Sequence, residues 1–142
     1  MIATIIATMS GLLQVSFGLS LPSLDVSRPV FVNDHGETTN HARPGQQVMI
    51  SLSVQNNIYL DEAKPLVIIL DMRDQNGVTT YLAWQSAKVA PNATYNAGFS
   101  WIVPYDPMAG GTYSARTFAI TGFGNDSLAL SNVFESNIEA SQ

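Results

Sequence analysis

Two histidines and two carboxylates stand close together in one short stretch of this 142-residue sequence. His35 and His41 lie with Asp34 and Glu37 in a loop that runs from Asn33 to Pro44. Imidazole and carboxylate groups bind borderline metal ions, so this loop could hold one if it folded back on itself. The two imidazoles lack a helical spacing that would align them, so we interpret the stretch as a solvated connection and predict no metal and no cofactor.

The same two histidines would have to serve any Ser-His-acid arrangement. The sequence contains no glycine-flanked nucleophile, phosphate-binding glycine loop, HExxH helix or paired-cysteine motif. Asp71, Asp74 and Asn76 resemble part of a calcium loop, but they lack its alternation and its terminal acidic ligand. Turn chemistry explains these three residues. We therefore predict a protein that is not an enzyme.

Two N-glycosylation sequons occur, Asn92-Ala93-Thr94 and Asn125-Asp126-Ser127. Both fall in predicted turns, where a glycosyltransferase can reach the asparagine. Asn92 and Asn125 are therefore the candidate modification sites.

Several aromatic residues are expected on the surface, where their rings could stack on sugars. Ordinary strand packing explains most of them, so a carbohydrate-binding module is a remote alternative. These aromatic residues are Tyr59, Tyr81, Tyr95, Tyr105 and Phe123.

Composition excludes several classes of protein. Lys and Arg number 6 against 11 acidic residues, which gives a net charge of −5 and no cationic field for nucleic acid or anionic lipid. The absence of cysteine excludes disulfide scaffolds, thiolate metal sites and thiol nucleophiles. The length corresponds to about one domain.

The first 23 residues form an uncharged, largely apolar segment typical of export. We expect residues 1–23 to be a signal peptide, although the usual basic start is missing. An uncleaved membrane anchor is the alternative, and a segment belonging to the fold, such as a strand donated to a neighbour, is a third. The expected location is extracytoplasmic, either secreted or attached to the cell surface.

From residue 24 onward, short alternating segments separated by Gly, Pro and Asn predict antiparallel strands and no long helix. We expect residues 24–142 to form an all-β, seven-stranded sandwich of the immunoglobulin or fibronectin type III kind, with a partly open barrel as the alternative. The expected strands are Asp25–Asn33, Gln47–Gln55, Pro65–Arg73, Val78–Gln85, Thr94–Val103, Thr112–Ile120 and Leu128–Ile138.

The middle of the chain gives the most specific expectations. Pro65–Arg73 is apolar almost throughout, which predicts a central strand covered on both faces. Asn76-Gly77 predicts a two-residue type I′ turn into the next strand. In that strand we expect Leu82 and Trp84 to face the core while Tyr81 and Ala83 face outward. Trp84 and Trp101 are the expected large core anchors.

Four stretches resemble the cell-adhesion-related, CARDB-like modules of archaeal and bacterial surface proteins. They are RPGQQVMISLSVQN, DQNGVTTYLAW, VAPNATYNAGFSWIVP and GGTYSARTFAI, within a resemblance that covers about residues 25–138. The resemblance lies in turns and core positions rather than in chemistry. It implies an extracytoplasmic, non-catalytic, immunoglobulin-like module.

The expected function is therefore a secreted or cell-surface binding or structural module that acts in adhesion or envelope assembly. Its expected partners are other envelope or surface proteins, with self-association through sheet edges as one route. The alternative is a membrane-anchored accessory or pilin-like subunit of a surface filament.

Overall fold

A computed structural model describes residues 24–57, 64–105 and 111–141. These residues form nine strands, and no helix among them is long and apolar enough to cross a membrane. The predicted export segment, 1–23, and Tyr59 lie outside the described residues. The strands are β1 (Leu24–Val26), β2 (Val30–Val32), β3 (His41–Ala42), β4 (Gln47–Asn56), β5 (Lys64–Arg73), β6 (Thr79–Val89), β7 (Thr94–Ile102), β8 (Gly111–Ile120) and β9 (Phe134–Ala140).

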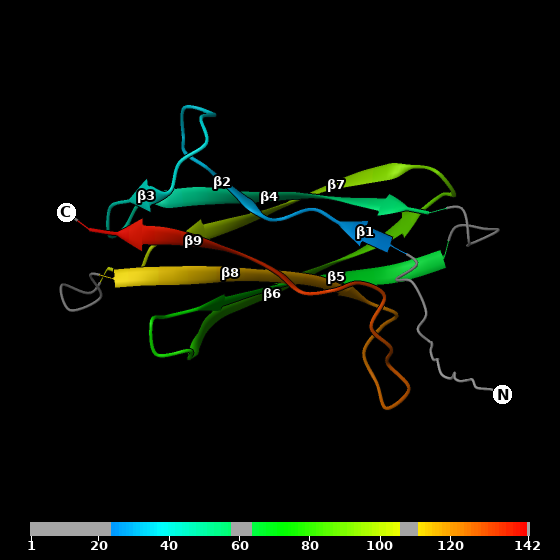
Figure 1. Cartoon of the computed structure of the whole chain (residues 1–142). Helices are drawn as coiled ribbons and strands as arrows, with labels where there is room; N and C mark the ends of the chain where they lie inside the picture. The colour runs from blue at the N-terminus through cyan, green and yellow to red at the C-terminus, as the bar shows by residue number, and fades with distance from the viewer. Residues whose placement is uncertain (1–23, 58–63, 106–110, 142) are drawn as a thin grey trace, which may run out of the picture.

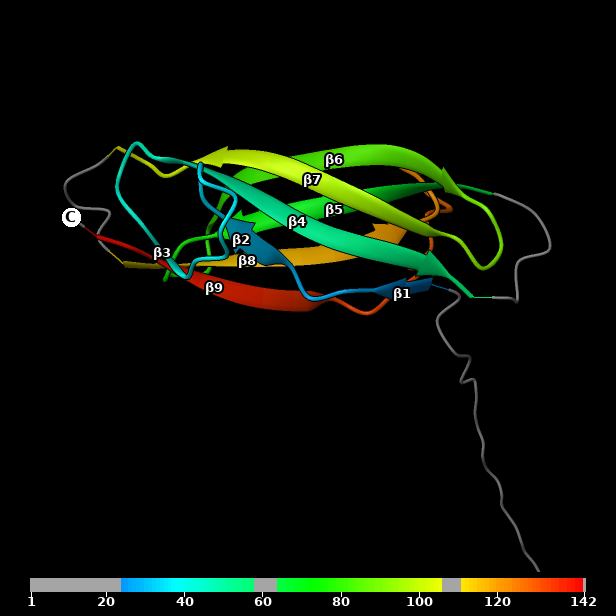
Figure 2. The ribbon, with the colours of Figure 1, turned by 90° about the horizontal axis from the view of Figure 1, so that it is seen from above.

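The strands form two sheets that lie face to face (Figure 1). In the four-stranded sheet, β4 pairs with β1, β2 and β7, and all three pairings are antiparallel. The five-stranded sheet has the order β3-β9-β8-β5-β6, in which only the short β3–β9 pairing is parallel. The all-β prediction is confirmed. Seen from above, β6 and β7 lie along the same side of the two layers (Figure 2).

The described strands number nine rather than seven, partly because the first expected strand is divided. β1 and β2 both pair with β4, but the ladder breaks before Val30, where Pro29 has no N–H to donate. His41–Ala42 adds the unexpected β3. The last strand begins at Phe134, six positions after the expected Leu128, and only an isolated bridge at Ala129 precedes it.

Alternation along three strands fills the space between the sheets as expected. Val48, Ile50, Leu52 and Val54 of β4 are all buried. One alternating face of β7 and one of β8 are also buried, and the Trp101 ring of β7 packs edge-on against the Tyr113 ring of β8 with centroids 5.3 Å apart. Trp101 is therefore confirmed as a core anchor.

The prediction for β6 is wrong in its faces. Trp84 and Leu82 are 56% and 54% exposed, whereas Tyr81 and Ala83 pack against the core. Directly opposed residues of neighbouring strands share one face of a sheet. Tyr81 lies opposite Met72, which is fully buried between the sheets, and Trp84 lies opposite Ile69, which points outward.

The turn between β5 and β6 also differs from the prediction. It has three residues between Asp74 and Val78, and only Gly77 takes a positive φ, of 79°. The Asp74 carboxylate oxygen Oδ1 accepts the N–H groups of Asn76 and Val78 at 2.9 and 3.0 Å. This side-chain bonding favours a type I turn followed by a left-handed glycine over the type I′ turn.

Candidate functional site: the outer face of the five-stranded sheet

The outer face of the five-stranded sheet is divided into an apolar part and a polar part. Cross-strand register places Trp84, Ile69 and Phe118 in one row across β6, β5 and β8. The next row along the strands reads Leu82, Asp71, Arg116 and Glu135. Because rows on one face of a sheet are about 7 Å apart, a single ligand can contact both parts.

The apolar part forms what we call the apolar shelf, composed of Ile69, Leu82, Trp84 and Phe123. Together these four side chains line a hollow of about 200 Å³. The Trp84 and Phe123 rings meet nearly at right angles, with centroids 5.5 Å apart, and Phe123 is 63% exposed. Ile69 at the base of the shelf is buried, so the predicted covering of β5 on both faces is confirmed. On the outer face of the sheet, β5 is covered by neighbouring side chains rather than by a second sheet.

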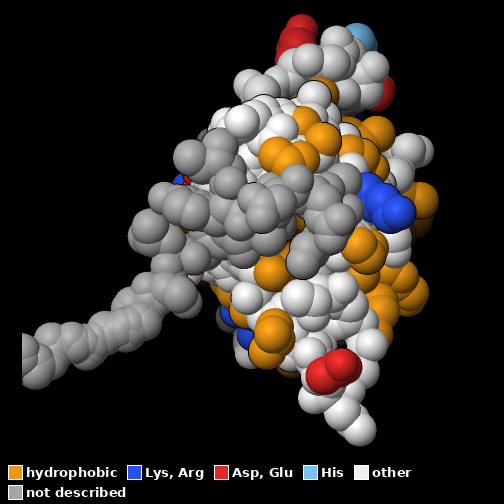
Figure 3. Space-filling view, turned by 90° about the vertical axis from the view of Figure 1, so that its right-hand side faces the viewer, with side chains coloured by type: hydrophobic (Ala, Val, Ile, Leu, Met, Phe, Trp, Pro, Cys, Tyr) orange, Lys and Arg blue, Asp and Glu red, His pale blue; other side chains and the backbone are white. Residues whose placement is uncertain are grey.

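The side of the molecule formed by β6 and β7 carries hydrophobic side chains with few charged ones among them (right-hand side of Figure 3). A contiguous group of exposed apolar side chains on one face marks a surface for interaction more often than isolated exposed residues do. The apolar shelf is such a group on the outer face.

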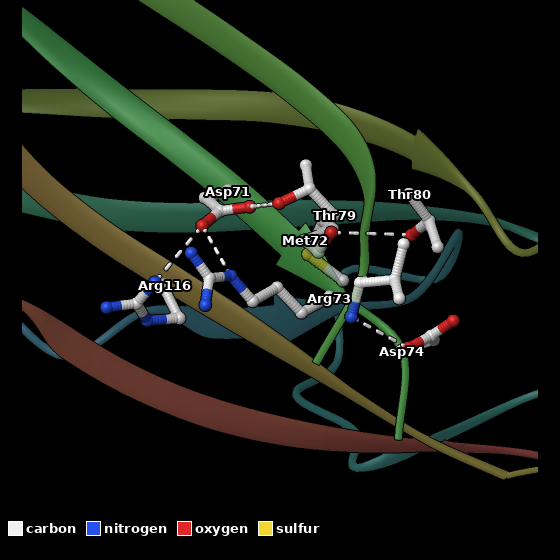
Figure 4. Close-up of polar contacts among 8 residues, drawn as sticks. Asp71, Met72, Arg73, Asp74, Thr79, Thr80 and Arg116 are labelled. Atoms are coloured by element: carbon white, nitrogen blue, oxygen red, sulfur yellow. Dashed lines mark hydrogen bonds and ion pairs between the residues drawn. The ribbon is translucent and has the colours of Figure 1, made fainter. Parts of the chain in front are cut away.

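A buried carboxylate organises the polar part. Asp71 Oδ2 accepts hydrogen bonds from Arg73 Nε at 2.8 Å and Arg116 Nη1 at 3.2 Å (Figure 4). Its other oxygen, Oδ1, accepts the Thr79 hydroxyl at 2.8 Å. The Asp71 side chain is only 8% exposed, whereas those of Arg73 and Arg116 are 38% and 27% exposed. The carboxylate therefore fixes two guanidinium groups that still reach solvent.

Beside this cluster lies a polar groove of about 550 Å³. Both arginines line it, and Glu135 and Asp74 bring acidic groups to the same walls, so charges of both signs are present. The remaining lining residues are Gln75, Gly77, Thr112 and Ser114. The groove offers hydrogen-bond donors and acceptors without a strong field of one sign.

The two long edge strands of the sandwich are protected differently. Side chains of β6 reach across to β7, where Tyr81 Oη donates to the Ser100 carbonyl at 2.9 Å and Gln85 Nε2 donates to the Gly98 carbonyl at 2.6 Å. These bonds occupy backbone acceptors that an added strand would need. Among the described residues, β6 itself pairs only with β5. Within that part of the chain, no strand pairs with its other edge.

The residues considered for metal or catalytic chemistry are dispersed. His35 pairs with Asp34, Nδ1 to Oδ1 at 3.1 Å, and both side chains are more than 70% exposed. His41 Nε2 lies 2.6 Å from the Ser141 hydroxyl, and both residues are exposed. Within the described part of the chain, no three His, Asp or Glu side chains gather as metal ligands. Asp71 instead binds the arginines, and Asp74 and Asn76 take part in the turn.

Both sequon asparagines are exposed and lie in turns. Asn92 takes a positive φ of 63°, and its N–H donates to the Asn56 carbonyl at 3.0 Å. Its side chain remains on the surface between β6 and β7. Asn125 lies in the turn after β8, where the Ser127 N–H donates to the Gly124 carbonyl. Modification at these two positions remains a prediction.

Of the aromatic residues expected on the surface, Tyr105 and Phe123 are 85% and 63% exposed. Tyr81 and Tyr95 are half-buried and pack against the core, so the prediction that they are exposed is wrong for both. Sequence reasoning missed Trp84 as a surface residue. Because β5 is apolar on both faces, no pattern in the sequence could show which face of β6 is covered.

No family model and no curated protein matches the chain. Among solved structures, it is similar to the C-terminal domain of Wzt, with a TM-score of 0.69 and 10% identity over 86% of this chain and 75% of that one. It also resembles the alkylpurine DNA glycosylase AlkC of Pseudomonas fluorescens, with a TM-score of 0.58 and 8% identity over 84% of this chain and 31% of that one. For the β-glucosidase EmGH1 of Erythrobacter marinus the TM-score is 0.57, with 17% identity over 84% of this chain and 15% of that one. At these identities the similarity shows the fold alone, an all-β arrangement of two sheets.

Proposed function

We propose that this chain is a non-catalytic binding and structural module of the cell surface, acting in adhesion or envelope assembly through the outer face and edge of its five-stranded sheet. The observation that carries the proposal is the apolar shelf, because Leu82, Trp84 and Phe123 are each more than half exposed on one face. They adjoin β6, whose outer edge has no partner strand among the described residues. Apolar surface beside an open edge suits the addition of a partner's strand.

The same proposal includes the finer type of the fold, the export of the chain and its modification. The two-sheet arrangement supports an immunoglobulin-like or fibronectin-like sandwich, and the sequence stretches given above support a CARDB-like module. The uncharged segment 1–23 supports export, with a membrane-anchored accessory subunit as the alternative. The exposure of Asn92 and Asn125 supports a glycoprotein.

A non-catalytic role is supported by the polar groups on the described surface. Asp71 is held between two arginines and has no cavity-facing oxygen left without a donor. Ser141 is the only hydrogen-bond partner of the His41 ring among the described residues, and both are in solvent. An exposed Ser-His contact lacks the buried orienting acid that activates a nucleophile.

The test places a photo-reactive amino acid at position 82 in the protein's own cells, with position 102 as the matched control. Leu82 and Ile102 are both exposed apolar residues, but they lie on different sheets. We expect cross-linking at 82, and not at 102, to a protein recovered from the medium or the washed envelope. The intact mass of the same material reports cleavage near residue 23 and sugar on the sequons. Cross-linking at neither position, or recovery only from the cell interior, would overturn the proposal.

Carbohydrate binding is the second candidate, favoured by the right-angled Trp84–Phe123 pair beside the polar groove. Aromatic faces stack on sugar rings, while arginine and carboxylate groups bond sugar hydroxyls. We expect cellotetraose to bind in isothermal titration calorimetry and the Trp84→Ala variant to weaken binding by about ten-fold, a loss of about 1.4 kcal/mol. The Ile102→Ala variant serves as the control. Equal affinity of wild type and Trp84→Ala would exclude the shelf as a sugar site.

A further inference from the structure

The open edge of β6 has few of the features that prevent strands from pairing. Its eleven residues include one charged side chain, Lys88, and no proline. Charged residues, prolines and very short strands are the usual means by which proteins block a sheet edge. The register shift between Met72 and Arg73, opposite the start of β6, is the one irregularity in the β5–β6 ladder. From Tyr81 to Val89 the ladder is regular.

The other edges of the two sheets contrast with β6. Within the described residues, β3 has two residues and β1 and β2 have three each, so these edges are short. The long β7 edge has two of its carbonyls bonded by Tyr81 and Gln85. Among the described edge strands, β6 is the longest and combines regular pairing with a backbone edge that no described strand occupies.

The apolar shelf is continuous with this edge. Leu82 and Trp84 project from β6 itself onto the outer face, and both are more than half exposed. A strand added beside β6 would extend the sheet and bring its own outward side chains against them. The edge would then supply backbone hydrogen bonds, and the shelf would supply apolar burial.

From these features we propose that the partner of β6 is a second copy of this chain, joined through antiparallel β6–β6 pairing about a two-fold axis. The inference rests on the proposed function and names its partner. A pairing centred on Trp84 spans the length of β6 and sets the two Trp84 side chains side by side. Lys88 then faces Thr80 of the second copy, so no like charges oppose each other. The two shelves merge into one apolar surface.

Charge elsewhere on the face is compatible with such a dimer. The net charge of −5 would favour separation if acidic groups lay at the edge. On this sheet, however, Asp71 is neutralised by arginines, and Glu135 and Glu139 lie on β9, which β8 and β5 separate from β6. The contact edge itself carries one charged residue per copy, Lys88, and no acidic residue.

The test is sedimentation equilibrium of the purified full-length protein, wild type and two variants. Wild type is expected as a dimer in the micromolar range. Leu82→Lys places a charge on the shelf of each copy and should raise the dimer dissociation constant at least ten-fold, about 1.4 kcal/mol or more. Ile102→Lys, at a similarly exposed apolar position on β7 (62% against 54% for Leu82), should leave the dissociation constant unchanged. Circular dichroism of each variant checks that it is folded.

Amide hydrogen exchange provides a second readout that needs no variant. In the dimer, the outward N–H groups of Tyr81–Val89 gain partners, so their protection should rise with protein concentration while that of β7 stays constant. A monomer throughout the concentration range, loss of the dimer in Ile102→Lys alone, or a dimer with unchanged β6 exchange would each overturn the inference. If position 82 cross-links only to a different protein, the proposed function stands and self-association fails.

Discussion

Replacing Trp101 with alanine is expected to lower the free energy of unfolding by about 3 to 5 kcal/mol. The Trp101 side chain is 2% exposed, lies opposite Val48 in the β4–β7 ladder and packs edge-on against Tyr113 of the other sheet. Its removal leaves a cavity between two sheets whose hydrogen-bonded strands cannot collapse into it. Because domains are stable by only about 5 to 15 kcal/mol, the loss should be plain in urea unfolding followed by circular dichroism.

The matched control is Trp84→Ala, which removes the same side chain from the opposite environment. Trp84 is 56% exposed, and its described ring contact is with Phe123. We expect a loss of about 1 kcal/mol, measured at a concentration low enough to keep the protein monomeric. Equal losses for the two variants would contradict the faces assigned to β6 and β7.

The contrast between these tryptophans shows what the sequence could predict. In β7 the apolar residues alternate with polar ones, so the inward face of Trp101 follows from the pattern. In β6 both alternating sets contain apolar residues. Its faces are fixed by pairing with β5, because Tyr81 of β6 lies opposite Met72 of β5 and shares its inner face. However, β5 is apolar on both sides. Only the three-dimensional pairing decides which set is buried.

The candidate site was less predictable than the strands. Asp71 and Arg116 are 45 positions apart in sequence and meet because β5 and β8 pair in one particular register. The short β3 pairs with β9 near the other end of the chain. Such long-range pairings leave little local signal. The sequence did predict a positive φ at Gly77. However, hydrogen bonding by the Asp74 side chain produces a different type of turn from the one expected.

Replacing Asp71 with asparagine should lower the free energy of unfolding by about 2 to 3 kcal/mol. Asparagine keeps the shape of the side chain and can still bond Thr79. It removes the negative charge that faces Arg73 Nε and Arg116 Nη1, leaving two cations side by side against a nearly buried group. Urea unfolding of Asp71→Asn beside wild type measures the loss.

The control is Glu135→Gln, which removes a carboxylate from the same groove at an exposed position. Glu135 lies opposite Arg116 on β9, but the described hydrogen bond to Glu135 involves its backbone carbonyl, which Arg28 contacts. The change should stay within about 0.5 kcal/mol. If Glu135→Gln were as destabilising as Asp71→Asn, the arginines would be held by the groove as a whole. A selective loss at Asp71 would show that one buried carboxylate fixes both guanidinium groups next to the apolar shelf.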